Sequence, residues 1–154
     1  MALQQDLVLH PNARLVQIYV DRMLLSYATK QITEHANFSH LRSLIDNFAV
    51  AENVLHKLMK QTTAGMLQPA PYLFIQAMER TEAGLTFVEL RALRELGFNS
   101  GASFVAIYNE QGKLLEPDQL PKPYNPTHFK LLVSMTIGVI LLILVLGLIH
   151  FLSS

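Results

Sequence analysis

The hydrophobic pattern divides this chain into a long mixed region and one unbroken apolar run near its end. From Leu131 to Leu152 there is no Asp, Glu, Lys or Arg. As a helix this run is roughly 33 Å long, enough to cross the hydrocarbon core of a bilayer. A buried core helix is the alternative, but the preceding region is too small to surround such a run. The pattern therefore predicts a transmembrane anchor over 131–152 in a single-pass, tail-anchored protein.

The first part of the mixed region, from about Pro11 to His35, contains good helix formers and no helix-breaking residue, which predicts a helix. Its apolar residues cover most of the helix circumference: Leu15, Val16, Ile18, Tyr19, Val20, Met23, Leu24, Leu25 and Tyr27. Such a helix is either the centre of its domain or a surface that meets another protein. Tyr19, Met23 and Tyr27 follow helical spacing and have side chains suited to interfaces, so they are candidate interface residues. The alternative is that all three are core residues.

A second helix is predicted from about His40 to Thr62, after the candidate caps Asn37 and Ser39. Its apolar residues form one stripe, and Glu52 falls inside that stripe with His56 one turn later. Glu52 is expected to reach water or to pair with His56 or with Arg22. An interface role for Glu52 and His56 is a second interpretation, and a metal or proton-handling site is a third. Because this spacing is common by chance, no metal ion is expected.

The remaining elements are marked by turn and cap residues. Pro69 and Pro71 predict a turn, and the segment 72–84 that follows is predicted to be a short helix, with a buried strand over its first residues as the alternative. Thr86 and Glu89 form a capping-box pair. They predict a helix that runs to Leu96 and ends at Gly97.

The segment Ser103–Leu115 contains β-branched and aromatic residues around an NEQG turn, which predicts a β-hairpin. The sequence thus predicts an α+β, mainly helical small cytoplasmic domain over 1–116 with this one hairpin. Four prolines then mark a juxtamembrane spacer over 117–130: Pro117, Pro121, Pro123 and Pro126.

Composition narrows the function classes. The 12 Lys and Arg residues balance the 12 Asp and Glu residues, so no nucleic-acid partner is expected. The chain has no cysteine, which excludes a thiol nucleophile and Cys-ligated metal sites. We find no phosphate-cradling glycine loop, nucleophile elbow or haem-ligand spacing in the sequence. No catalytic residue, cofactor or metal ligand is therefore assigned, and the chain is predicted not to be an enzyme.

Lys122 and Lys130 precede the apolar run and no basic residue follows it, which favours a cytoplasmic N-terminal domain, with the bacterial inner membrane as the favoured location. The predicted function is a non-enzymatic scaffold or assembly subunit of a multi-protein membrane complex, such as bacterial secretion or envelope machinery. Its expected partners are the lipid bilayer and other protein subunits. Ser134 and Gly138 form a small-xxx-small pair that favours helix packing in the membrane, including in a homo-oligomer; passive anchoring is the alternative.

Two other function classes stay open. The predicted order of helix, short helix, helix and hairpin resembles a winged-helix module, with Tyr108–Gly112 as the tip of the wing. This resemblance implies a membrane-tethered regulatory domain that binds a soluble ligand or nucleic acid. The last class is an enzyme that acts at the membrane.

Overall fold

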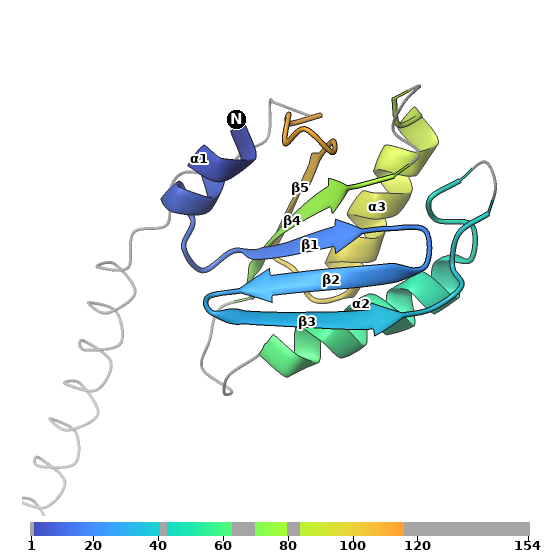
Figure 1. Ribbon diagram of the computed structural model, residues 1–154, viewed down its shortest axis with the longest axis horizontal. Helices are drawn as coiled ribbons and strands as arrows, with labels where there is room; N and C mark the ends of the chain where they lie inside the picture. Colours follow the sequence, from blue (N-terminus) through green and yellow to red (C-terminus); the bar gives the residue numbers. More distant parts are fainter. Residues whose placement is uncertain (1, 41–42, 63–69, 80–83, 116–154) are drawn as a thin grey trace, which may run out of the picture. The chain divides into compact units, whose positions relative to one another are not determined.

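The computed structural model describes residues 2–40, 43–62, 70–79 and 84–115. They form a five-stranded mixed sheet with the strand order β3-β2-β1-β4-β5 (Figure 1). The elements, in chain order, are α1 (Ala2–Leu9), β1 (Arg14–Ile18), β2 (Arg22–Tyr27), β3 (Lys30–His35), α2 (Phe48–Thr62), β4 (Tyr72–Ala77), α3 (Phe87–Asn99) and β5 (Phe104–Tyr108). The fold is α+β, but the prediction of a mainly helical domain is wrong, because the sheet is its centre.

The predicted helix over 11–35 is instead the antiparallel meander β1, β2 and β3. A strand with apolar residues on both faces gives the same composition as a helix that is apolar on all sides. Here the burial alternates with period two: in β1, Arg14, Val16 and Ile18 are buried, and Leu15 and Gln17 are half-buried. The turns contain neither Gly nor Pro. Ala28 takes a left-handed φ of 51° between β2 and β3, a conformation that is uncommon for Ala. The two turns therefore lack the helix-breaking residues by which a turn is usually recognised in a sequence.

Strand β4 lies beside β1 in parallel register, and β5 lies beside β4, also parallel. The predicted short helix after Pro71 is thus wrong, and its strand alternative is confirmed by β4. The predicted hairpin over 103–115 is confirmed only close to its turn: the Asn109 amide donates to the Lys113 carbonyl at 3.0 Å, the Leu115 amide donates to the Ile107 carbonyl at 2.9 Å, and a single bridge joins Tyr108 to Leu114. The main partner of β5 is β4. The helical order that suggested a winged helix is absent from the described segments.

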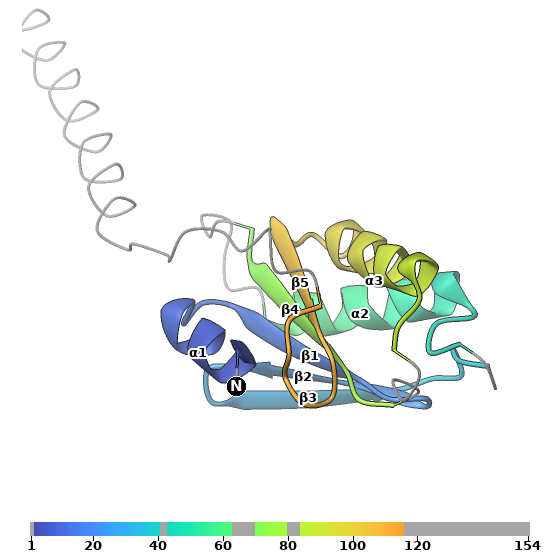
Figure 2. The same cartoon turned by 90° about the horizontal axis from the view of Figure 1, so that it is seen from above.

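Helices α2 and α3 cover one face of the sheet (Figure 2). The main core lies between them and the strands, and its largest members include Phe38, Ile18, Leu25, Leu55, Leu73 and Leu93. The capping box of Thr86 and Glu89 is confirmed, with both reciprocal hydrogen bonds present. Gly97, however, lies inside α3, where a Cβ would be 2.6 Å from Val105 Cγ2. This glycine therefore brings α3 close to β5, and the helix ends later, at Asn99, with Ser100 as its C-cap.

Arg14 joins the first strand to the end of α2. Its guanidinium donates to Thr62 Oγ1 at 2.7 Å and to the Thr62 carbonyl at 2.8 Å, and it stacks over the Tyr27 ring. Carbonyl groups at a helix C-terminus lack partners within the helix and carry partial negative charge, so a cation is favoured there. Burial lowers the pKa of Arg14. The contact fixes α2 over the strands.

Helix α1, which the sequence did not predict, packs on the opposite face of the sheet from α2 and α3. It covers the β4 and β5 half of that face. A second apolar cluster lies beneath it and includes Leu3, Ala13, Phe74, Ala106 and Tyr108. The Leu3 amide donates to the Gly112 carbonyl at 3.1 Å, which ties α1 to the turn after β5.

Within the described ranges, no helix is long and apolar enough to cross a bilayer. The predicted spacer over 117–130 and the predicted span over 131–152 lie outside the described residues, and so do Ser134 and Gly138. The transmembrane anchor therefore stays a prediction from the sequence.

Candidate docking surface

The sheet face opposite α2 and α3 is covered by α1 on one half only. On the other half, β1, β2 and β3 present side chains with no described helix packed over them (Figure 1). We call this surface the open face and define it by eight residues that are each half-buried or exposed: Gln17, Tyr19, Arg22, Leu24, Ser26, Gln31, Thr33 and His35. Leu15 on β1 packs against the cluster beneath α1 and lies at the border of the open face. Along β1 and β2, the residues of this face alternate with buried core residues. The strands therefore hold the open face rigidly in position.

The strand register arranges the open face in rows. Gln17 lies opposite Leu24, and Leu24 lies opposite Thr33, so an apolar side chain is flanked by two polar ones. The Gln17 amide donates to Gln76 Oε1 on β4 at 2.9 Å. Gln76 in turn donates to the carbonyl of Glu110 at 2.9 Å. These two glutamines form the polar border between the open half and the half under α1.

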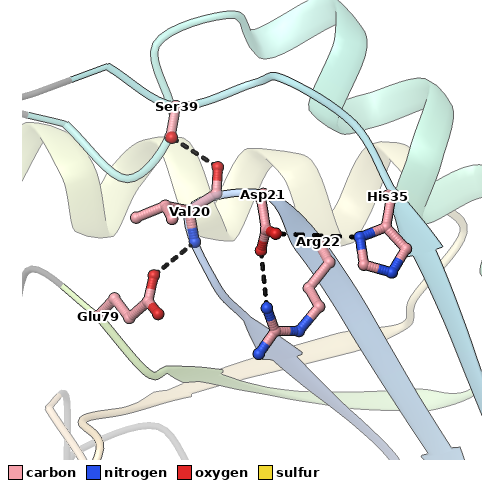
Figure 3. Close-up of polar contacts among 6 residues, drawn as sticks. All are labelled: Val20, Asp21, Arg22, His35, Ser39 and Glu79. Atoms are coloured by element: carbon pink, nitrogen blue, oxygen red, sulfur yellow. Dashed lines mark hydrogen bonds and ion pairs between the residues drawn. The ribbon is translucent and has the colours of Figure 1, made fainter.

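Charged and aromatic side chains gather at one end of the open face, where β1 turns into β2. The Arg22 guanidinium lies 4.1 Å from the centre of the Tyr19 ring, close enough for a cation–π contact. Arg22 also pairs with Asp21 at 2.9 Å, and His35 Nδ1 lies 4.0 Å from the same carboxylate (Figure 3). All of these side chains are partly exposed, so each pair contributes modestly to stability.

The backbone of this turn is held from two sides. The Glu79 carboxylate, just after β4, accepts a hydrogen bond from the Val20 amide at 2.8 Å (Figure 3). The Ser39 hydroxyl donates to the Val20 carbonyl at 2.6 Å. Because β1 and β4 are parallel neighbours, their carboxyl ends meet at the same edge of the sheet. Glu79 joins these two ends, so the position of Tyr19 and Arg22 is set by three separate segments of the chain.

No protein-family model matches this chain, and no curated protein sequence matches it significantly. Within the described segments, no three His, Asp or Glu residues are grouped so that they could hold a metal ion. The open face combines a small apolar centre with polar, charged and aromatic neighbours. Such a composition can bury against another protein, with Tyr and Arg as the residue types that most often contribute binding energy.

The structure separates the three candidate interface residues of the first segment. Tyr19 lies on the open face, stacked on Arg22. Met23 is fully buried in the core between the sheet and the helices. Tyr27 is on the helix side, beneath the Arg14 guanidinium at 4.7 Å. Their grouping by helical spacing was wrong, because the chain reverses between β1 and β2. Tyr19 lies opposite Arg22 across this turn, whereas Met23 and Tyr27 share the other face of β2.

Glu52 and His56 lie on α2, where Glu52 is half-buried and His56 is exposed. In the described part of the chain, neither forms a hydrogen bond or ion pair with the other or with Arg22. Arg22 instead contacts Tyr19 and Asp21. The pairing expected from the sequence is therefore not formed, and Glu52 and His56 are on the helix layer rather than on the open face.

The sequence analysis missed Gln17, Arg22 and Leu24 as surface residues. The sequence held only a weak signal for them: Gln17 is the one polar residue among the apolar and aromatic residues 15–20, and the alternation at period two appears in the burial of β1. The same alternation continues through β2, where Arg22, Leu24 and Ser26 share the open face.

A second polar cluster, beneath α1, is buried instead of open. The Tyr108 hydroxyl donates to Asp6 Oδ2 at 2.9 Å, and burial together with this carboxylate raises the pKa of Tyr108. His10 packs edge-on against Tyr72 and Phe74. Burial lowers the pKa of His10, against the opposing effect of Asp6, and its Nδ1 atom has no hydrogen-bond partner in the described structure. This cluster joins α1 to the sheet.

Proposed function

We propose that the described domain is a non-enzymatic docking domain that binds another protein subunit through the open face. The observation that carries this proposal is the half-covered sheet. Leu24 and Tyr19 stay half-buried on rigid strands, while the equivalent half of the same face is sealed by α1. Apolar area that the domain's own helices leave uncovered gains free energy when a partner covers it.

The chemistry of the open face limits its partner. The centre at Leu24 is apolar and small, and its surroundings offer amide, hydroxyl and guanidinium donors from Gln17, Thr33 and Arg22. Arg22 is only partly neutralised by Asp21, because both side chains are substantially exposed. A protein surface with a small apolar centre and acceptor groups around it fits this arrangement. A partner of this kind would be a subunit of a multi-protein membrane complex.

The membrane part of the proposal rests on the sequence of 131–152 and on Lys122 and Lys130 before it. It places the docking domain on the cytoplasmic side. The chain has no cysteine, so single cysteines can report sidedness. Cysteine in place of exposed Lys113 should be labelled by a membrane-impermeant maleimide only after the membrane is opened, whereas cysteine in place of Ser153 should be labelled in intact cells. The reverse pattern would contradict the orientation.

A photoreactive residue tests the open face directly. The residue replaces Ser26 on the open face or, as the control, exposed Lys113. Each variant is full-length and is expressed in the native host cells. Ser26 should give an adduct with one defined protein, and Lys113 should not. Adding Leu24→Glu should abolish the Ser26 adduct while the melting temperature of the purified chain stays nearly unchanged. Equal adducts at both positions, or an adduct that survives Leu24→Glu, would contradict docking at this face.

A further inference from the structure

The two edges of the sheet differ. At the β5 edge, the returning segment 113–115 bonds to the strand, with the Leu115 amide donating to the Ile107 carbonyl at 2.9 Å. At the other edge, β3 pairs with β2 alone, and no described segment pairs with its outer side. An uncovered edge is a template for another strand, and proteins commonly protect it with proline, a bulge or a covering segment. Among the described residues, β3 has none of these. Charged side chains also protect an edge, and β3 has Lys30 and Glu34, which a pairing strand has to match with opposite charges.

The direction of the free backbone groups follows from the ladder. The Ala36 amide donates inward to the Asp21 carbonyl, next to β2. Backbone groups alternate in direction along an antiparallel strand, so Lys30, Ile32 and Glu34 also bond inward. The amides and carbonyls of Gln31 and Thr33 then face outward. All six residues of β3 are exposed or half-buried at their side chains.

We propose that β3 pairs with β3 of a second copy of this chain, in antiparallel register with Ile32 opposite Ile32 of the second copy. A two-fold axis through this pair keeps each sheet face continuous. It also places Lys30 of each copy opposite Glu34 of the other, so the central apolar pair is flanked by two opposite-charge pairs. Gln31 and Thr33 supply the backbone hydrogen bonds. This inference goes beyond docking on the open face and does not depend on it.

The side chains select this register over its neighbours. Shifting the pairing by two residues in one direction puts Ile32 opposite Glu34, and shifting it in the other puts Lys30 opposite Ile32. A one-residue shift would place the helix side of one copy beside the open face of the other. Only the proposed register pairs like apolar residues and opposite charges together, which is the arrangement that stabilises cross-strand neighbours.

Glu34 is already placed for this contact. Lys57 of α2 donates to its Oε2 at 2.7 Å, and Gln61 approaches its Oε1 at 3.4 Å. The Lys57 ammonium lowers the pKa of Glu34, which keeps the carboxylate ionised. A carboxylate accepts about four hydrogen bonds, so Lys30 of a second copy can bind without displacing Lys57.

The absence of native cysteine allows a direct test in full-length chain in detergent micelles. Opposed residues that do not exchange backbone hydrogen bonds have close side chains, so Ile32→Cys should form an intermolecular disulfide on mild oxidation. Lys113→Cys, at the opposite edge, is the control for association through any other part of the chain. An Ile32→Cys yield no higher than that of Lys113→Cys would overturn the proposal.

Charge reversal tests the register. In the Ile32→Cys background, Lys30→Glu and Glu34→Lys each turn two attractive pairs into repulsive ones. Each should weaken the dimer affinity by about tenfold and therefore lower the disulfide yield. Mixing the two variants restores both opposite-charge pairs, so a disulfide-linked heterodimer should form. A mixture that crosslinks no better than either variant alone would exclude this register.

Loss of the Lys57 contact in Glu34→Lys is a folding risk, so a further pair of variants tests the edge alone. Thr33→Pro removes an outward-facing amide and leaves the bonds to β2 in place, because an edge strand tolerates proline there. It should abolish the Ile32→Cys disulfide at an unchanged melting temperature, and Thr33→Val should keep it. A disulfide that survives Thr33→Pro would contradict pairing through this edge.

Discussion

Phe74 and Leu24 lie on the same face of one sheet, yet their surroundings differ. Phe74 on β4 is fully buried beneath α1, in contact with His10 and Tyr108. Leu24 on β2 is half-buried between polar neighbours, with no described helix above it. The covered half has a closed apolar cluster with one internal polar contact, whereas the open half has solvent-facing polar groups around a small apolar centre. One half of this face thus contributes mainly to stability and the other offers contacts to a partner.

The largest expected effect is the difference in unfolding free energy lost when a side chain is truncated in the covered half and in the open half. Phe74→Ala removes a fully buried ring and should lower the free energy of unfolding by about 3–5 kcal/mol. Leu24→Ala removes a side chain that is already partly in water, and it should cost roughly 1 kcal/mol or less. Urea unfolding of both variants measures the difference. Equal costs would mean that the open half is covered in solution.

The hydrogen bond beneath α1 gives the next effect. Tyr108→Phe leaves the Asp6 carboxylate in its buried place without its hydroxyl donor, which should cost about 1–3 kcal/mol. Tyr72→Phe is the matched control, because this half-buried tyrosine contributes ring contacts only among the described residues. Thermal unfolding should show a lower midpoint for Tyr108→Phe alone. A shift of the same size in both variants would show that the hydroxyl of Tyr108 has no special role.

His10 should make the covered half sensitive to acid. Burial lowers its pKa in the folded state, so the unfolded chain binds a proton more readily than the folded chain does. The stability present above about pH 6.5, the ordinary value for histidine, should therefore be lost as the pH falls through the folded pKa. His10→Phe and His10→Asn both remove the imidazole, but their new side chains differ in size and polarity, so a change common to both comes from the loss of the imidazole. Both should show a shallower fall in unfolding free energy between neutral and acid pH, and an unchanged slope in both would contradict this origin.

The smallest expected effect lies on the open half. Arg22→Met keeps the aliphatic stem and removes the charge, together with the contacts to Tyr19 and Asp21. Exposed pairs of this kind contribute about 0–1 kcal/mol, so the melting temperature should hardly change. Partner capture at Ser26 should nevertheless weaken. Strong destabilisation would place Arg22 with the structural residues of the covered half.

The helices and the strands of this fold were not equally predictable from the sequence. The capping box of Thr86 and Glu89 and the single apolar stripe of α2 are local signals, so both helices were predicted. The predicted start of the second helix near His40 was wrong, because α2 begins at Phe48, and the predicted end of the third at Gly97 was wrong, because α3 ends at Asn99. The meander over 14–35 was missed, because residues with good helix propensity form strands here through pairing with β4, which lies far along the chain. Residues 15–20 are apolar or aromatic except for Gln17, so they show no clear polar alternation, and no Gly or Pro marked the turns.

The candidate site was predictable only in part, for the same reason. Tyr19 was selected and does lie on the open face, whereas Met23 and Tyr27, selected by helical spacing, point to the opposite side of the sheet. Arg22 was considered only as a partner for Glu52. The contacts of the open face depend on which strands are neighbours, and neighbours such as Gln17 and Gln76 are separated by 59 positions along the chain. No local pattern carries that information.

The hydrogen bond between the Leu3 amide and the Gly112 carbonyl affects the order in which this domain folds during synthesis on the ribosome. Helix α1 leaves the exit tunnel first, but its docking partners Tyr108 and Gly112 are among the last parts of the domain to be made. The β1–β3 meander is local and can form early, whereas α1 has to wait until β5 has emerged. During synthesis the whole face of the nascent sheet is therefore exposed, and α1 is the last element to seal its half.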